Sequence, residues 1–236
     1  MSNNYFQFKE FTIQQGNCAM KVCTDACLFG AFIANSKLIT GNILDIGTGT
    51  GLLSLMLAQK SRGNIDAVEI EAGAFAQAKE NFEASPWKDR LKIYYTDILN
   101  FHPEKKYAHI ISNPPFYEDN LRPEDEGKNA AKHDSNLTLK VLLSLINDLL
   151  SNEGSFSILL TYHRIDYFEK QAKQYGFYLQ EKLLVKHTAD HPVFRGILIF
   201  SRSLKIVTNS SLLIKEGQGN YSGEFIELLK DYYLNI

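Results

Sequence analysis

A short run that is apolar except for one aspartate, Ile43-Leu44-Asp45-Ile46, leads directly into glycines at alternate positions, Gly47, Gly49 and Gly51. An apolar segment that starts at Leu52 follows. Glycines at this spacing let the backbone turn tightly and bring its N–H groups close to a ligand. A strand, a glycine-rich turn and a helix in this order are typical of a parallel sheet that binds its ligand at the carboxyl ends of the strands. The feature therefore predicts an α/β fold with a binding site at this turn.

The chain continues the alternation of strand and helix with short connections, which indicates parallel strands with helices on both faces. Strands are expected at 43–46, 65–69, 91–96, 107–111, 155–160, 178–186 and 197–203. The last two are joined without a helix and should be antiparallel. We predict a doubly wound, seven-stranded Rossmann-like sheet with an antiparallel last strand, divided into an N-terminal hairpin and helix (1–40), a core (41–204) and a C-terminal tail and helix (205–236).

The two terminal additions have patterns of their own. Alternating apolar residues predict a hairpin whose turn lies at 15–17, and Thr24 is expected to cap a helix that ends near Asn35. Ser222 is expected to cap a final helix with an apolar stripe that extends to Tyr232.

Composition excludes several classes of protein. The formal charge is −2, but the stretch 161–215 carries an excess of +5, counted as nine Lys and Arg against four Asp and Glu, which leaves −7 elsewhere.

No segment reaches the roughly 18 apolar residues needed to cross a bilayer, and the start resembles no signal peptide, so we expect a cytoplasmic protein without a membrane partner. We also expect a monomer, with Cys18, Cys23 and Cys27 as reduced thiols. No metal site is expected, because Pro192 follows His191 at once and the spacing of His187 and His191 needs a helix.

The tetrapeptide Asn113-Pro114-Pro115-Phe116 directly follows the fourth predicted strand. Its prolines fix the loop, so that the Asn113 side chain and the Pro114 carbonyl can both point into the pocket. Two acceptors on the N–H groups of a conjugated amine free its lone pair for attack on a methyl group, while Phe116 can stack on the acceptor ring. These four residues are the predicted catalytic set.

The glycine spacing with Asp45 upstream resembles the S-adenosylmethionine pocket of class I methyltransferases, whereas a dinucleotide fingerprint would need glycine at Leu52. In this resemblance Glu69 accepts hydrogen bonds from the ribose hydroxyls and Asp97 faces the adenine amine. The predicted cofactor-binding residues are Asp45, Gly47, Thr48, Gly49, Gly51, Glu69, Ile70, Asp97, Ile98 and Asn113.

Longer stretches resemble the bacterial tRNA1(Val) (adenine(37)-N6)-methyltransferase family. They include Phe11-Thr12-Ile13, 18–25, 44–53, 66–69, Ser85-Pro86-Trp87, 110–115 and 218–222, and Phe116-Tyr117 stands where relatives often have Tyr then Phe. The resemblance implies methylation of the adenine just 3′ of the anticodon of a valine tRNA. The alternatives are a sister enzyme acting on rRNA guanine N2 or protein glutamine, a nicotinamide oxidoreductase, and a non-catalytic RNA-binding module.

Contacts with RNA are expected at basic residues around the predicted pocket. The candidates are Lys21, Lys132, His133, Lys186, His187 and Arg195. Lys132 and His133 belong to a loop at 117–136 with six acidic residues, which we interpret as a lid that turns its acids to solvent. The stronger candidates lie in the basic C-terminal third, in the connection between the last two predicted strands.

Overall fold

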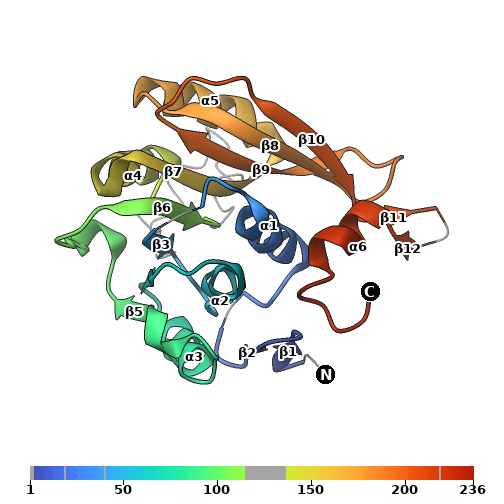
Figure 1. Cartoon of the computed structure of the whole chain (residues 1–236), viewed down its shortest axis with the longest axis horizontal. Helices are drawn as coiled ribbons and strands as arrows, with labels where there is room; N and C mark the ends of the chain where they lie inside the picture. The colour runs from blue at the N-terminus through green and yellow to red at the C-terminus, as the bar shows by residue number, and fades with distance from the viewer. Residues whose placement is uncertain (1–2, 19, 40, 115–136, 218) are drawn as a thin grey trace, which may run out of the picture.

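A computed structural model of the chain describes residues 3–18, 20–39, 41–114, 137–217 and 219–236. Its centre is an eight-stranded sheet in the order β10-β8-β9-β7-β6-β3-β4-β5 (Figure 1). The strands are β3 (Ile43–Ile46), β4 (Ile65–Glu69), β5 (Leu91–Tyr95), β6 (Tyr107–Ser112), β7 (Leu150–Thr161), β8 (Tyr178–Lys186), β9 (Val193–Ser201) and β10 (Thr208–Leu213). The α/β class is confirmed, and β9 is antiparallel to both β7 and β8, as predicted for the strands joined without a helix.

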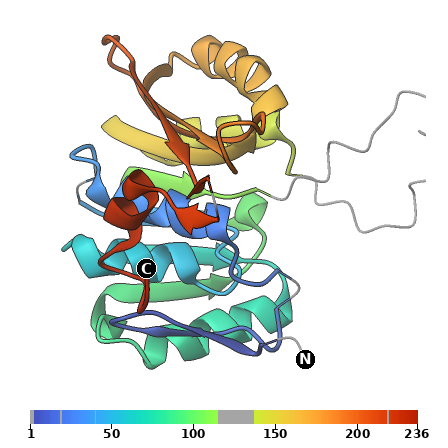
Figure 2. The same ribbon diagram turned by 90° about the vertical axis from the view of Figure 1, so that its right-hand side faces the viewer.

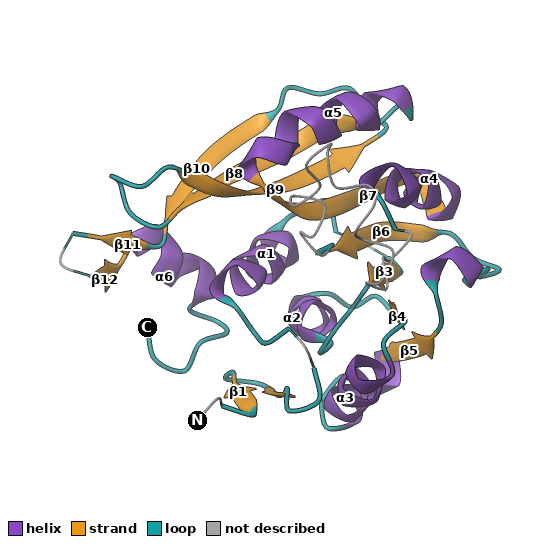
Figure 3. Ribbon diagram, turned by 180° about the vertical axis from the view of Figure 1, so that it is seen from behind, coloured by secondary structure: helices purple, strands orange, loops and turns teal. Residues whose placement is uncertain are grey.

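The sheet has eight strands rather than the seven predicted. The additional strand, β10, pairs in parallel with β8 at the outer edge, as Figure 3 shows from behind. Its sequence is polar, and its first four residues are exposed, so it lacks the alternation that marks a half-buried strand. An edge strand is held by backbone hydrogen bonds to a single neighbouring strand, so it can form without the alternating hydrophobic pattern by which a strand is predicted.

Helices cover both faces of the sheet (Figures 1 and 2), and the sheet separates two hydrophobic cores, one under each layer of helices. One face carries α1 (Thr24–Asn35), α2 (Leu52–Lys60), α3 (Ala72–Glu83) and α6 (Gly223–Leu229). The other carries α4 (Leu139–Leu149) and α5 (Ile165–Gln174). Alternate residues of each strand pack into opposite cores, because successive side chains of a strand point to opposite faces. In β7, for example, Leu159 packs with α1 and α2, whereas Ile158 and Leu160 pack with α4 and α5.

The N-terminal hairpin differs from the prediction in the place of its turn. β1 (Tyr5–Gln7) pairs with β2 (Thr12–Gln14), so the turn lies at 8–11 and not at 15–17. Phe8 and Phe11 stack at 4.5 Å between ring centroids and are both buried. The gain from burying two aromatic rings outweighs the turn preference of the glycine further on.

Three other boundaries were predicted imperfectly. Cys23, not Thr24, is the N-cap of α1, and no side chain caps this helix. Strand β7 starts at Leu150, directly after α4. The Ser222 cap is confirmed by its 3.0 Å bond from the Phe225 backbone N–H, but α6 ends at Leu229, and Tyr232 packs in the tail that follows.

The N-terminal hairpin and the C-terminal tail contact each other. Phe8 forms an isolated β-bridge with Tyr233, and the Lys9 N–H donates to the Tyr232 carbonyl over 2.8 Å. The Tyr232 hydroxyl donates to the Met56 carbonyl of α2. Two short strands, β11 (Lys215–Glu216) and β12 (Asn220–Tyr221), precede α6. Both additions are therefore packed against the same helical layer.

A buried polar chain links β6 to β7 inside the sheet. His109 is fully buried, and its ring nitrogens lie 2.8 Å from the Ser155 hydroxyl and 3.0 Å from the Ser157 hydroxyl. Burial lowers the pKa of His109 to about 3. The ring is therefore neutral at physiological pH and serves as a satisfied core histidine.

Two further findings concern the cysteines and the search for membrane-spanning helices and metal sites. Cys18 and Cys27 are buried, Cys23 is exposed, and all three are free. In the described part of the chain no helix is long and apolar enough to cross a membrane, and no group of three or more His, Cys, Asp or Glu side chains is arranged to hold a metal ion.

Candidate active site

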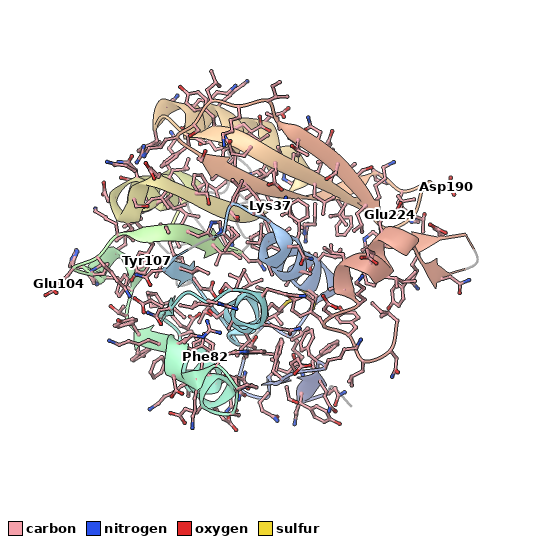
Figure 4. All side chains as sticks on the ribbon, viewed as in Figure 1. Lys37, Phe82, Glu104, Tyr107, Asp190 and Glu224 are labelled. Atoms are coloured by element: carbon pink, nitrogen blue, oxygen red, sulfur yellow. The ribbon has the colours of Figure 1, made fainter. Side chains whose placement is uncertain are left out.

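The glycine turn between β3 and α2 has the open geometry that its sequence predicts. Gly47, Gly49 and Gly51 all have positive φ angles, of 71°, 58° and 83°. A Cβ atom at Gly47 or Gly49 would meet nothing within 4 Å, so the backbone faces open space there. A Cβ at Gly51 would lie 2.6 Å from the Phe82 ring of α3, whose position Figure 4 labels. Two of the glycines thus open a cradle, and the third allows close packing.

Asp45 lies fully buried beneath this turn, on the face of the sheet that α2 covers. Its Oδ2 accepts hydrogen bonds from the Thr48 hydroxyl at 2.6 Å and the Ser54 hydroxyl at 2.7 Å. Its Oδ1 has no partner among the described residues. Burial raises the pKa of Asp45 to about 6, against these two hydrogen bonds, which lower it. A buried acceptor with one unpartnered oxygen fits a donor supplied by a ligand.

Glu69 ends β4 and is held by the backbone around it. Its Oε2 accepts from the Gly49 N–H at 2.8 Å, and its Oε1 accepts from the N–H groups of Ile70 and Glu71, each at 2.9 Å. Because each carboxylate oxygen can accept more than one hydrogen bond, a diol can still bind it. Ile70 is 59% exposed beside it.

Asp97 and Ile98 follow β5. Asp97 caps a short 3-10 helix, η2 (Ile98–Asn100), by accepting the Leu99 N–H at 3.0 Å. This is the turn role that an Asp after a strand commonly has. Ile98 is buried in the core under α4 and α5. The structure brings Asp45, Glu69 and Asp97 to the carboxyl ends of three adjacent parallel strands, β3, β4 and β5.

A segment of the N-terminal addition lies against the cofactor end of this site, which the sequence did not indicate. Asn81 of α3 is 1% exposed; its side chain accepts the Gln14 N–H at 2.8 Å and donates to the carbonyls of Gln14 at 2.9 Å and Thr50 at 2.8 Å. Gln77 accepts the Asn17 N–H at 3.2 Å. Asn81 thus ties the N-terminal segment to the glycine turn, and Gln77 ties the same segment to α3.

Cys18 belongs to the same segment. Burial, with the negative charges of Glu69 and Glu71 as the next causes, raises the pKa of its thiol to about 11. Cys18 therefore lies in the electrostatic field of the predicted ribose-binding carboxylate and stays protonated at neutral pH.

Asn113 and Pro114 follow β6, the neighbour of β3 on the side opposite to β4. Pro114 is buried, and the Oδ1 atom of Asn113 is buried with no hydrogen-bond partner among the described residues. An unpaired buried amide oxygen costs free energy unless a ligand satisfies it. Pro115, Phe116, Lys132 and His133 lie outside the described residues.

The remaining predicted RNA contacts lie around the same edge. Lys186 ends β8, and the exposed His187 begins the β8–β9 connection, whose Asp190 Figure 4 labels. The His187 ring stacks on Phe194 at 4.0 Å between ring centroids. Arg195 of β9 donates through Nε to Asp25 Oδ2 at 2.8 Å. Lys21 is exposed and contacts the Asn3 carbonyl. Nothing in the sequence paired Arg195 with Asp25, because the two residues are far apart in the chain.

The family model "Methyltransferase small domain" matches residues 26–133. The chain is 42% identical to the tRNA1(Val) (adenine(37)-N6)-methyltransferase of Dyadobacter fermentans, with 99% of each chain covered. It is 39% identical to the enzyme of the same name from Bacteroides thetaiotaomicron, with both chains fully covered. The chain belongs to this methyltransferase family.

Membership of the tRNA1(Val) (adenine(37)-N6)-methyltransferase family agrees with the solved structures that resemble the fold. A predicted O-methyltransferase from Agrobacterium tumefaciens aligns with a TM-score of 0.67 at 14% identity, covering 90% of this chain and all of that one. A methyltransferase from Pyrococcus furiosus aligns with a TM-score of 0.53 at 19% identity, covering 75% of this chain and 83% of that one. At these identities the likeness shows the fold alone.

Proposed function

We propose that this protein transfers a methyl group from S-adenosylmethionine to N6 of adenine 37 in tRNA1(Val), in the cytoplasm. The observation that carries the proposal is the unpartnered, buried Oδ1 of Asn113 beside β3, in a chain about 40% identical over its full length to enzymes of that name.

The residues at the edge fit the cofactor in charge and in hydrogen-bonding capacity. S-adenosylmethionine presents a positive sulfonium, an ammonium, ribose hydroxyls and an adenine amine, which are cations or donors. Asp45, Glu69 and Asp97 offer acceptors, one of which, Asp45 Oδ1, has no partner in the described structure. The open backbone at Gly47 and Gly49 leaves room for close approach. When bound, this cofactor supplies an electrophilic methyl group.

Asn113 and Pro114 prepare the attacking nitrogen. The Asn113 Oδ1 and the Pro114 carbonyl accept the two N6 hydrogens, which turns the nitrogen lone pair out of conjugation with the ring. The bound cofactor would supply the methyl group and leave as its neutral thioether, while the two acceptors hold N6 in line with that group; the methylated nitrogen would then lose one proton to water. The positions of the acceptors, rather than a strong base, carry the reaction.

The variant Asn113→Ala tests this function. We expect Kd for S-adenosylhomocysteine to stay within about threefold of wild type and methyl incorporation into the tRNA transcript to fall by roughly 100-fold, as for the loss of one preorganised polar group. Asn209→Ala, at an exposed position of β10, is the matched control. Activity of Asn113→Ala within a few-fold of wild type would remove Asn113 from the reaction.

The substrate needs a separate experiment. Nucleoside mass spectrometry of valine tRNA from cells with and without the gene should show N6-methyladenosine only when the gene is present. Unchanged N6-methyladenosine would rule out this tRNA and leave rRNA guanine or protein glutamine as acceptors.

A further inference from the structure

Polar side chains form a row at the carboxyl edge of the sheet, on the face covered by α1 and α2. Asp45 of β3 lies on this face, because it bonds Ser54 of α2. Arg195 of β9 lies on it too, because it bonds Asp25 of α1. Between β3 and β9 the sheet places β6 and β7, in that order. The ends of these two strands therefore supply the centre of the row.

Thr161, the last residue of β7, points to the same face. Leu159, two residues earlier, packs in the core under α1 and α2, and side chains two apart on a strand share a face. Thr161 pairs directly with Arg195 across β7 and β9. Ile158 is level with Ser112, the last residue of β6, so Thr161 lies three residues beyond the end of β6, past the level of Asn113. No sequence motif indicates this position of Thr161, since it depends on strand order.

The Thr161 hydroxyl is buried without a partner. The residue is 8% exposed, and Oγ1 forms no hydrogen bond with the described residues. The Oδ1 of Asn113, directly after the neighbouring strand β6, is likewise buried without a hydrogen-bond partner among the described residues. Buried polar groups are nearly always satisfied, and two such groups at adjacent strand ends fit a shared polar ligand.

The positions of the other acceptors along the sheet edge indicate on which side of Asn113 the acceptor base lies. Asp45, Glu69 and Asp97 occupy β3, β4 and β5, all on one side of β6. The opposite side, over β7 and β9, carries none of these cofactor-binding candidates. We therefore assign it to the acceptor base. There the Thr161 hydroxyl can donate a hydrogen bond, which the Asn113 oxygen cannot.

We propose that Thr161 completes the pocket for the target adenine by donating a hydrogen bond to the ring nitrogen next to the amino group, N1 or N7, with the Asp25–Arg195 ion pair as the far wall. The inference rests on the proposed function and adds a positioning contact to it. Adenine then offers donors to Asn113 and Pro114 and an acceptor to Thr161. One base edge satisfies both orphan groups.

Thr161→Val tests the contact, since it removes the hydroxyl and keeps the shape. We expect kcat/KM for the tRNA to fall about tenfold, the value of one hydrogen bond, and Kd for S-adenosylhomocysteine to change less than twofold. The melting temperature should stay the same or rise, because the variant removes an unpaired buried hydroxyl. Thr161→Ser should recover most of the activity. Thr208→Val, at an exposed position of β10, is the control.

Transcripts that carry 1-deazaadenine or 7-deazaadenine at the target position identify the atom. The correct deaza substrate should lower wild-type kcat/KM about tenfold and lower that of Thr161→Val no further. The inference is overturned by Thr161→Val activity within twofold of wild type, by a lower melting temperature with weaker S-adenosylhomocysteine binding, or by additive losses with both deaza substrates. A wild-type enzyme that leaves the ordinary transcript unmethylated refutes the proposed function itself, and this inference with it.

Discussion

The pH dependence of cofactor binding tests the role of Asp45. Burial raises the pKa of this carboxyl to about 6, so it is partly protonated near that pH in the free protein. If its unpartnered Oδ1 meets a cationic donor of the cofactor, binding favours the charged form and lowers the pKa. Cofactor binding should then release the proton of Asp45.

The size of the effect follows from that pKa. If the pKa falls to 5 or below in the complex, Kd for S-adenosylhomocysteine decreases about five- to tenfold from pH 5 to pH 7, because the ionised fraction of Asp45 rises about tenfold in the free protein and much less in the complex. Calorimetric titration at pH 5.5 in two buffers of different ionisation enthalpy should show release of roughly 0.5–0.7 proton. Asp45→Asn, which has no titrating group, should remove both effects. A pH-independent Kd in the wild type, or the same pH dependence in Asp45→Asn, refutes the reasoning.

The same pKa predicts the opposite trend in the free protein's stability. The folded pKa of about 6 exceeds the ordinary value of 3.8, so the unfolded chain ionises first as pH rises. The stability contribution of Asp45 is therefore fully present below pH 3.8 and is lost as pH rises to about 6, by about 3 kcal/mol. Chemical unfolding at several pH values should show the stability of Asp45→Asn, relative to wild type, increasing over this range. A difference that is constant with pH contradicts it.

Two further predictions concern the frame of the site. Gly51→Ala should lower the free energy of unfolding by about 3 kcal/mol, since its positive φ and the 2.6 Å approach to Phe82 both oppose a methyl group; Gly217→Ala, where a Cβ meets nothing within 4 Å, is the control, and equal melting temperatures would contradict the prediction. His109, with a pKa of about 3 against an ordinary 6.5, contributes stability above pH 6.5 that is lost as pH falls toward 3. Stability measured against pH should therefore fall less steeply in acid for His109→Gln, and an unchanged slope would count against this.

Local patterns predicted the parts of the fold in which neighbouring residues decide the structure. The turn at 47–51 joins β3 to α2 at the predicted residues, because its glycines adopt conformations that few other residues can. Strand β10 was missed because pairing with β8, not burial, holds it. The hairpin turn was misplaced because Phe8 and Phe11 pack into a core formed partly by the C-terminal tail, more than 200 residues away in the 236-residue chain.

The same distinction between local motifs and distant contacts applies to the residues of the candidate site. Asp45 and Glu69 lie near the carboxyl ends of their strands, and Asn113 directly follows its strand. All three belong to short motifs, so their position at one edge could be predicted from parallel topology. Asn81 and Thr161 belong to no motif. Their roles depend on which backbone carbonyl or strand end lies opposite them, and that depends on strand order and on the route of the N-terminal segment.

The N-terminal addition contacts the site at both of its ends. At the cofactor end, Asn81 ties Gln14 to the carbonyl of Thr50 in the glycine turn. At the other end, Asp25 holds Arg195 opposite Thr161. A single stretch of chain thus connects the two halves of the edge, which are separated by the breadth of β3, β6 and β7 in the sheet. Because Gln14 and Asp25 belong to the same N-terminal addition, this addition contacts both the cofactor cradle and the opposite wall.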